Sequence, residues 1–216
     1  KIDGAEILNR IEREGVTLLN GAPAVVAAIL DAAAARRARG DAVPGRGTVR
    51  IVVAGAPPPS KTIERVETEL GWEFIQIYGL TETAPLLTIN RGREEWDGLS
   101  AGDRAARLGR AGVPAVGVRI DISDQGEVLA RSNVVLKSYW DQPEATADAL
   151  EGGWFHTGDG GVLDDEGYVT ISDRRKDVII TGGENVSSIE VEDCLFSHPD
   201  VAEVAVIGVP SEKWGE

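Results

Sequence analysis

The sequence predicts an α/β protein in three parts. In the first part, helical patterns alternate with short apolar strands, which is typical of a parallel sheet with flanking helices. In the second part, short strands and turns replace the helices, which indicates a β-rich subdomain such as a distorted barrel. In the third part, a hairpin and one helix indicate the start of a small α+β C-terminal domain. The predicted parts are residues 1–95, 96–172 and 173–216.

The α/β part contains three predicted helices and three predicted strands. Asp and Ser are typical residues at the start of a helix, and Pro is favoured in the first helical turn. The strand segments are apolar, and the second is rich in β-branched residues. Asp3 and Ser60 are the predicted N-caps of the first and third helices, and Pro23 is predicted to start the second. The predicted strands are 16–21, 48–55 and 73–79.

The β-rich part consists of short apolar segments separated by glycine and acidic turns. After it, the third part begins with a hairpin-like pair of strands, continues with a helix at about 187–196, and ends with a strand at 201–207. The predicted strand segments of the β-rich part are 115–122, 126–132, 152–159 and 160–172.

Composition narrows the class of protein. A net charge of −14 disfavours nucleic-acid binding, which depends on Lys and Arg contacts to phosphates. No apolar run reaches the roughly 18 to 20 residues of a membrane helix, and the start of the chain has no secretory pattern. The single cysteine, Cys194, excludes an internal disulfide framework and fits a cytoplasmic location. The chain therefore fits a soluble protein that handles small molecules, and homo-oligomer formation is left open.

The ends of the sequence indicate a piece of a longer protein. The chain contains no Met, opens with Lys1 and stops shortly after an apolar segment. We therefore expect further sequence on both sides of it.

A polar turn, YGLTET, follows the third predicted strand. Ligands of open α/β sheets bind at the carboxyl ends of strands. Gly79 permits close approach of the backbone to a ligand, and the amides and hydroxyls of Thr81 and Thr83 can donate to phosphate oxygens. Glu82 can bind Mg²⁺, and Tyr78 offers a flat face for a base. The alternative is an ordinary polar turn after a strand.

Two further motifs carry similar chemistry. In FHTGDGG, the carboxylate of Asp159 can accept from two vicinal ribose hydroxyls, although a turn Asp is the alternative. In SDRRKD, the basic cluster of Arg174 to Lys176 suits a nucleotide phosphate, although a solvated surface turn is the alternative. Gly182 and Gly183 form either a hairpin turn or a close approach to a ligand.

Other motifs favour plain structural roles. Ser100 lies in a G-x-S-x-G pattern, but the polar segment before it is no core strand, so a surface loop is expected rather than a nucleophile. Cys194 is expected to be a small buried apolar residue. His156 and His198 are too far apart in sequence to indicate a metal pair.

The three motifs, YGLTET, GWFHTGD and DRRKDVIITGGENVSSIEVED, occur in an order and spacing that resemble the adenylate-forming superfamily. This superfamily contains acyl-CoA synthetases, adenylation domains of peptide synthetases and luciferases. Segment 126–150 is also similar to it, so the resemblance covers nearly the whole chain. Leu80 stands where peptide-synthetase domains usually carry Pro, and the C-terminal segment resembles synthetases of fatty or related acids.

The resemblance implies an ATP-dependent carboxylate–CoA ligase of fatty acid metabolism. Such an enzyme uses ATP, Mg²⁺, a small carboxylic acid and coenzyme A, and forms first acyl-AMP with pyrophosphate and then acyl-CoA with AMP. Thr81 and Glu82 are the implied catalytic residues, with Thr81 at a phosphate and Glu82 holding Mg²⁺. The implied nucleotide-binding residues are Gly55, Ala56 and Pro57 near adenine, Tyr78 stacked on adenine, Gly79 and Thr81 in the turn, and Asp159 with Arg174 at the ribose. Lys176 is the implied hinge, and Gly182, Gly183 and Glu184 border the implied CoA channel.

Departures from the family pattern define the alternatives. The Gly/Ser/Thr-rich phosphate loop and the late C-terminal lysine of the family are not found in the sequence, so we expect this chain alone not to catalyse adenylation efficiently. Ser187 and Ser188 stand where Tyr or Ile and then Pro are common. The alternatives are an acyl-AMP ligase or adenylation domain that loads a carrier protein, and a non-catalytic nucleotide-binding relative. The segment 16–30 is expected to contribute to the acyl pocket, and the acid itself is not named by the sequence.

Overall fold

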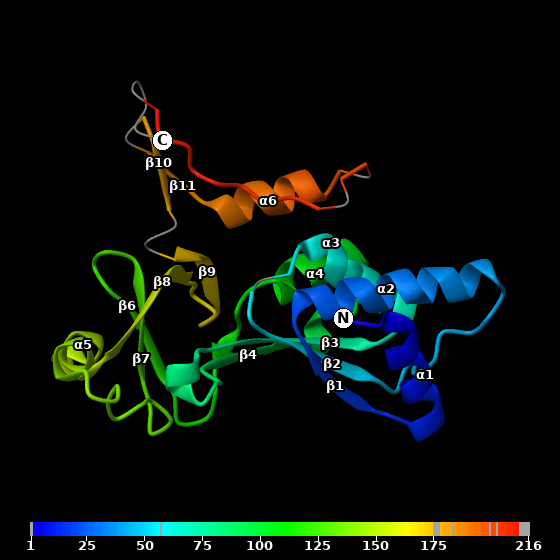
Figure 1. Cartoon of the computed structure of the whole chain (residues 1–216), viewed down its shortest axis with the longest axis horizontal. Helices are drawn as coiled ribbons and strands as arrows, with labels where there is room; N and C mark the ends of the chain where they lie inside the picture. The colour runs from blue at the N-terminus through cyan, green and yellow to red at the C-terminus, as the bar shows by residue number, and fades with distance from the viewer. Residues whose placement is uncertain are drawn as a thin grey trace. The chain divides into compact units, whose positions relative to one another are not determined.

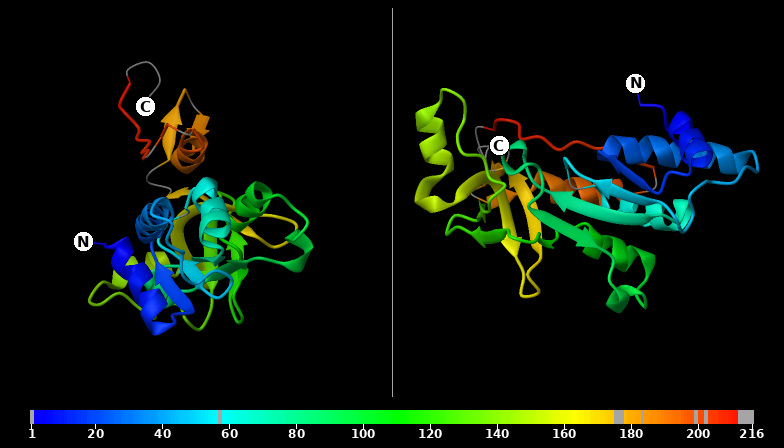
Figure 2. Two further views of the ribbon diagram at one scale, coloured as in Figure 1. Left: turned by 90° about the vertical axis from the view of Figure 1, so that its right-hand side faces the viewer. Right: turned by 90° about the horizontal axis from the view of Figure 1, so that it is seen from below.

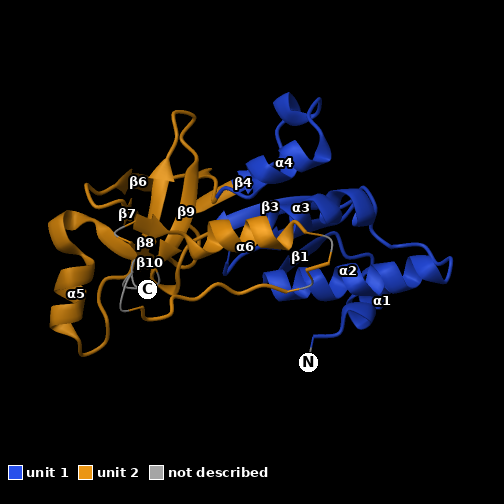
Figure 3. Ribbon diagram, turned by 90° about the horizontal axis from the view of Figure 1, so that it is seen from above, with its two compact units in different colours: residues 1–77, 90–110 blue, residues 78–89, 111–216 orange. Residues whose placement is uncertain are grey.

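The computed structural model of the chain describes residues 2–56, 58–174, 178–182, 184–198, 200–201 and 203–211 (Figure 1). The chain divides into two compact units. The first unit holds residues 1–77 and 90–110, and the second holds residues 78–89 and 111–216 (Figure 3).

The first unit contains the predicted parallel strands and their helices, but these strands are part of a five-stranded mixed sheet in the order β1-β2-β3-β4-β5, in which β4 and β5 are antiparallel. Strands β1, β2 and β3 are neighbours in this order, and both pairs are parallel. Helices α1 and α2 contact each other, as do α3 and α4. The elements are α1 (Gly4–Glu14), β1 (Leu18–Gly21), α2 (Pro23–Ala38), β2 (Arg50–Val53), α3 (Ser60–Arg65), the π-helical turn Val66–Leu70, β3 (Glu73–Tyr78), the 3-10 turn Glu94–Trp96 and α4 (Ala101–Leu108).

The limits of the first helix follow from its local chemistry. Oδ1 of Asp3 accepts a hydrogen bond from the amide of Glu6 at 3.1 Å, and Gly15 ends the helix in the left-handed region with φ of 63°.

The third helix starts differently from the prediction. Pro59 occupies the N-cap and Ser60 is the first helical residue, so the predicted cap was wrong by one residue.

The second unit contains the strands predicted for the β-rich part, whereas residues 96–110, which were predicted as part of it, belong to the first unit. Four antiparallel strands lie in the order β6-β7-β8-β9 and form a curled half-barrel sheet. Figure 2 shows β8 and β9 side by side, and residues 164–168 form the turn between them. The elements are the 3-10 turn Thr81–Thr83, β4 (Thr88–Arg91), which crosses the border between the units, β5 (Val113–Pro114), β6 (Arg119–Ile122), β7 (Glu127–Arg131), α5 (Pro143–Ala149), the 3-10 turn Glu151–Gly153, β8 (Phe155–Leu163) and β9 (Val169–Arg174).

Two small apolar clusters hold this sheet and the turn after β3 together. Tyr78 packs against both clusters, so its ring joins them. The buried residues of the clusters are Leu87, Ala130 and Phe155 in one, and Ala111, Val128 and Val169 in the other. The α/β class with a β-rich second part is therefore confirmed.

The C-terminal part contains the predicted hairpin and helix. Strands β10 (Ile179–Thr181) and β11 (Glu184–Val186) are antiparallel, and α6 (Ser188–Phe196) follows. The carboxylate of Asp173, which is only 3% exposed, accepts from the amide of Ser188 at 2.9 Å and from its hydroxyl at 2.8 Å. These two bonds connect the start of α6 to the end of β9.

Two expectations for this part were wrong. The described residues among 201–207 form no strand. Cys194 is exposed rather than buried. Within the described part of the chain, every helix is too short or too polar to span a bilayer.

Candidate functional site

Gly79 begins the polar turn after β3 and is required there by a close approach of backbone to backbone. A Cβ atom on Gly79 would lie 1.7 Å from the carbonyl oxygen of Pro85. The amide of Leu87 donates to the carbonyl of Tyr78 at 2.8 Å, which brings the chain back beside the end of the strand. The turn is therefore a compact loop that only a glycine at this position permits.

Thr83 holds the turn together and is not a phosphate donor. Its side chain is fully buried. Its hydroxyl accepts from the amide of Leu80 at 2.9 Å and lies 3.0 Å from the Leu80 carbonyl, while its own amide donates to that carbonyl at 3.0 Å. The prediction that Thr83 can donate to a ligand was therefore wrong, because both of its donors are used inside the turn.

Thr81 and Glu82 are the polar side chains that the turn presents. Thr81 is exposed and Glu82 is half-buried. Oε1 of Glu82 accepts a hydrogen bond from the hydroxyl of Tyr139 at 3.1 Å, and the backbone carbonyl of Glu82 accepts from the amide of Leu136 at 2.7 Å. Glu82 is thus held through both its side chain and its backbone.

Tyr139 is a contact that the sequence reasoning missed. Partial burial raises the pKa of the Tyr139 phenol. The hydrogen bond to Glu82 and the negative charge of Glu82 raise this pKa further. The phenol is therefore protonated at neutral pH and donates to the carboxylate. The signal available in the sequence was the aromatic pair in LKSYW, within a segment similar to the adenylate-forming superfamily.

Tyr78 and Asp159 meet although they are 81 positions apart in sequence. The hydroxyl of Tyr78 donates to Oδ2 of Asp159 at 2.7 Å. Arg174 lies opposite Asp159 in the register of β8 and β9, and its Nε is 3.7 Å from Oδ1 of Asp159. The Arg174 side chain is mostly exposed, so its positive charge lies between the buried carboxylate of Asp159 and the solvent.

Burial governs the electrostatics of this group. It raises the pKa of Tyr78 far above the ordinary value, so the phenol is a permanent donor. It also raises the pKa of Asp159, and the charge of Glu127 adds to this, while the bond from Tyr78 and the charge of Arg174 act in the opposite direction. Asp159 is only 8% exposed, so its charge is costly in the folded protein without a ligand.

This cost gives a testable prediction. The raised pKa of Asp159 means that its carboxyl group binds a proton more tightly in the folded chain than in the unfolded chain. Ionisation of Asp159 therefore lowers the stability of the folded chain as the pH rises. This loss of stability is absent below the pKa of Asp in the unfolded chain, which is about 4. We therefore expect Asp159→Asn to unfold at a higher temperature than the wild type at pH 7. The difference should shrink as the pH is lowered toward 4, as measured by scanning calorimetry of the purified chain.

The control for this experiment is Asp165→Asn, because Asp165 is an exposed residue of the turn between β8 and β9. It should leave the unfolding temperature unchanged at every pH. A lower unfolding temperature for Asp159→Asn at pH 7 would mean that Tyr78 and Arg174 more than offset the burial of the carboxylate.

Glu127 supports the part of β8 that carries Asp159. It is only 6% exposed, and its Oε1 accepts from the amide of Gly158 at 2.9 Å. Its Oε2 lies 3.1 Å from Nδ1 of His156. Thr157 completes the support, because its hydroxyl donates to the Val128 carbonyl at 2.7 Å. These buried contacts position the backbone just before Asp159.

The other predicted site residues are distributed over the chain. Gly55 and Ala56 are exposed residues after β2 in the first unit, and Gly55 has φ of 100°. Gly182 is an exposed turn residue with φ of 61°, and Glu184 is exposed at the start of β11. The residues Pro57, Lys176 and Gly183 lie outside the described residues.

Ser100 has a structural role. Its hydroxyl accepts from the amide of Asp103 at 3.1 Å and donates to the Asp103 carboxylate at 2.6 Å, so it is the N-cap of α4. The expected loop is therefore a helix start, and the G-x-S-x-G pattern is not a nucleophile elbow.

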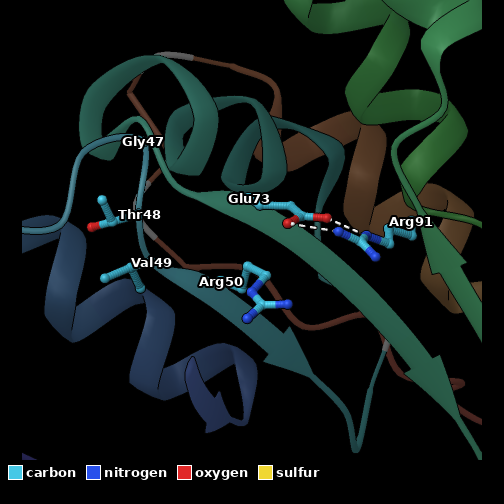
Figure 4. Close-up of a pocket in the computed structure, with 6 residues that line it drawn as sticks. All are labelled: Gly47, Thr48, Val49, Arg50, Glu73 and Arg91. Carbon is cyan, nitrogen blue, oxygen red and sulfur yellow. Dashed lines mark hydrogen bonds and ion pairs between the residues drawn. The ribbon is translucent and has the colours of Figure 1, made fainter. Parts of the chain in front are cut away.

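A separate pocket of about 300 Å³ lies in the first unit, where β2 and β3 begin (Figure 4). Arg91 forms an ion pair with Glu73 across it, and Arg50 is the other cation in its lining. Tyr78 is at the opposite end of β3. The pocket therefore contains none of the predicted site residues.

Comparison with known proteins gives consistent matches over the whole chain. The family model described as AMP-binding enzyme matches residues 2–140, and the model described as AMP-binding enzyme C-terminal domain matches residues 190–216. The 2-methylpropanoate–CoA ligase CCL4 of Humulus lupulus is 43% identical, and the 4-hydroxybutyrate–CoA ligase 2 of Metallosphaera sedula is 38% identical. Both matches cover 100% of this chain and 40% of the relative, so the chain spans about 40% of the length of these curated relatives.

Solved structures agree with these matches. The o-succinylbenzoate CoA synthetase (MenE) of Bacillus subtilis, in complex with the acyl-adenylate OSB-AMP, has a TM-score of 0.80 and 31% identity over 100% of this chain and 43% of the MenE chain. The amide bond synthetase McbA of Marinactinospora thermotolerans has a TM-score of 0.81 and 32% identity over 100% of this chain and 44% of the McbA chain.

Proposed function

The chain belongs to the AMP-binding enzyme family, and from this premise we propose that it is part of an ATP-dependent carboxylate–CoA ligase acting on a fatty or related carboxylic acid. The observation that carries the proposal is the contact of Tyr78 with Asp159 beside Arg174, in the same compact unit as Glu82. The names of the curated relatives, several of which are CoA ligases, support the choice of acceptor.

Asp159 and Tyr78 would hold the nucleoside. An ionised carboxylate offers about four acceptor positions. The bond from Tyr78 occupies one of them and the long contact to Arg174 weakly occupies another, so two vicinal ribose hydroxyls can still be bound. The ring of Tyr78 would stack on adenine, and the family resemblance assigns Gly55, Ala56 and Pro57 to adenine binding as well.

Glu82 and Thr81 suit a magnesium–phosphate group. Magnesium prefers one or two carboxylates together with substrate phosphates and water. Among the described residues, no group of three or more His, Cys, Asp or Glu side chains forms a metal cage, and Oε2 of Glu82 accepts no hydrogen bond. Glu82 would therefore hold Mg²⁺ against the phosphates, and the exposed hydroxyl of Thr81 would donate to a phosphate oxygen. The metal, when bound, supplies positive charge that offsets the developing charge on pyrophosphate.

The proposed reaction has two steps. A carboxylate oxygen attacks the α-phosphorus of ATP, the bond to the β-phosphate oxygen breaks, and pyrophosphate leaves. The sulfur of CoA then attacks the acyl carbon, loses its proton, and AMP leaves. A rotation of the small C-terminal domain about Lys176 would separate the two steps. The boundary of this domain would lie near Asp173. Gly182, Gly183 and Glu184 would border the CoA channel.

A cytoplasmic location is part of the proposal, although two relatives are named as peroxisomal.

The test uses the full-length protein and a panel of carboxylic acids. We expect acid-dependent exchange of pyrophosphate into ATP, followed by formation of a CoA thioester. Exchange without thioester formation would favour the acyl-AMP ligase that loads a carrier protein. Nucleotide binding without exchange for any acid would favour the non-catalytic relative. The purified 216-residue chain alone is expected to bind nucleotide but not to catalyse efficient exchange, and robust exchange by it would contradict this.

A further inference from the structure

We propose that Tyr139 is a positioning residue whose hydroxyl holds the Glu82 carboxylate in the orientation that binds the metal–phosphate group. The inference rests on the proposed function and deepens it, because it assigns a role to a residue outside the three motifs.

Glu82 is anchored twice by the segment that carries Tyr139. It lies on a single 3-10 turn, where an unattached side chain would sample several rotamers. The phenol bonds the side chain at 3.1 Å, and the amide of Leu136 bonds the backbone carbonyl at 2.7 Å. One stretch of chain, more than fifty positions away in sequence, therefore holds both the side chain and the backbone carbonyl of Glu82.

Tyr139 is itself held in place. Its amide donates to Oγ1 of Thr146 on α5 at 2.9 Å, and this hydroxyl donates to the carbonyl of Gln142 at 2.8 Å. Asp141 has φ of 52°, in the left-handed region, and turns the chain into the helix. The neighbouring Trp140 is 94% exposed, so the same short segment directs one aromatic ring to solvent and the other to Glu82.

The hydrogen bond between Tyr139 and Glu82 has a defined direction. A carboxylate only accepts hydrogen bonds, and a phenol hydroxyl donates one. The phenol uses Oε1 and leaves Oε2 without a partner among the described residues. Because one oxygen of the carboxylate is already held by Tyr139, the side chain of Glu82 is ordered before a cation binds. The other oxygen can then bind the cation without a further loss of side-chain entropy.

The test is Tyr139→Phe in the full-length protein, with nucleotide binding measured by calorimetry in the absence of the acid. Loss of a hydrogen bond to a charged group is expected to weaken binding of ATP with Mg²⁺ by about tenfold. Binding of ATP in the presence of a chelator should not change, because the bond acts through the metal ligand. The rate of acid-dependent exchange should fall by about the same factor, and half-maximal exchange should require more Mg²⁺.

Two further variants complete the design. Trp140→Phe is the matched control and should change neither binding nor exchange. Combining Tyr139→Phe with Glu82→Gln should lower metal-dependent binding no further than Glu82→Gln alone. An equal loss of ATP binding with and without Mg²⁺ in Tyr139→Phe, or wild-type behaviour of this variant, would overturn the inference. Failure of the proposed function would instead show in the wild type, either as an absence of exchange with every acid or as exchange without formation of a CoA thioester.

Discussion

Glu82→Gln in the full-length protein is expected to lower acid-dependent ATP–pyrophosphate exchange by about 10²- to 10³-fold. The substitution keeps the size of the side chain and an oxygen that accepts from Tyr139, but it removes the negative charge. A neutral amide is a poor ligand for Mg²⁺, so the charge of the phosphates would no longer be offset in the correct place. The measurement is radiolabelled pyrophosphate exchange at saturating ATP and acid.

The matched control is Glu151→Gln, because Glu151 is an exposed residue of the same unit. It should leave exchange at the wild-type rate. The unfolding temperature of Glu82→Gln should be close to that of the wild type, since the amide preserves the hydrogen bond. Exchange at the wild-type rate in Glu82→Gln would remove Glu82 from the mechanism.

Gly79→Ala is expected to give the largest loss of stability. The new Cβ would lie 1.7 Å from the carbonyl oxygen of Pro85, and this backbone atom cannot move aside as a flexible side chain can. Relief of the clash requires breaking the bond between Leu87 and Tyr78 that closes the turn. We expect the free energy of unfolding to fall by about 3 kcal/mol, at the upper end of the cost of overpacking, as measured by urea denaturation of the purified chain.

Gly92→Ala is the control for this substitution. A Cβ on Gly92 meets no atom within 4 Å, and its backbone is not in the left-handed region. It should change the free energy of unfolding by less than about 0.5 kcal/mol. A small and equal effect of both substitutions would show that the turn after β3 opens easily and is not tightly closed.

Local patterns in the sequence predicted most of the fold. The first helix could be bounded at both ends because Asp3 and Gly15 act on residues within one turn of themselves. The third helix was predicted one residue out, because Pro59 and Ser60 both suit a helix start and only the backbone geometry distinguishes them. The strand expected at 201–207 is not formed by the described residues there, since an apolar segment becomes a strand only when a neighbouring strand pairs with it.

The candidate site was predicted in part. Tyr78, Glu82 and Asp159 were selected by their residue types at the ends of predicted strands together with the resemblance to the adenylate-forming superfamily. Thr81 and Thr83 looked equivalent, however, and the structure separates them by burying Thr83 completely. Which of two hydroxyls faces outward in a turn depends on the path of the backbone, and residue type alone does not specify that path.

By itself the sequence determined the α/β class, the alternation of helices and strands up to β3 and the chemical character of the turns, because each depends on residues close together in the chain. Only the tertiary structure decided the partners: Tyr78 with Asp159, Glu82 with Tyr139, and Glu127 with Gly158, at separations of 81, 57 and 31 positions. These contacts depend on strand register and on loops packed against each other. A hydrogen bond forms only when two groups lie within about 3 Å, a condition that local patterns do not encode.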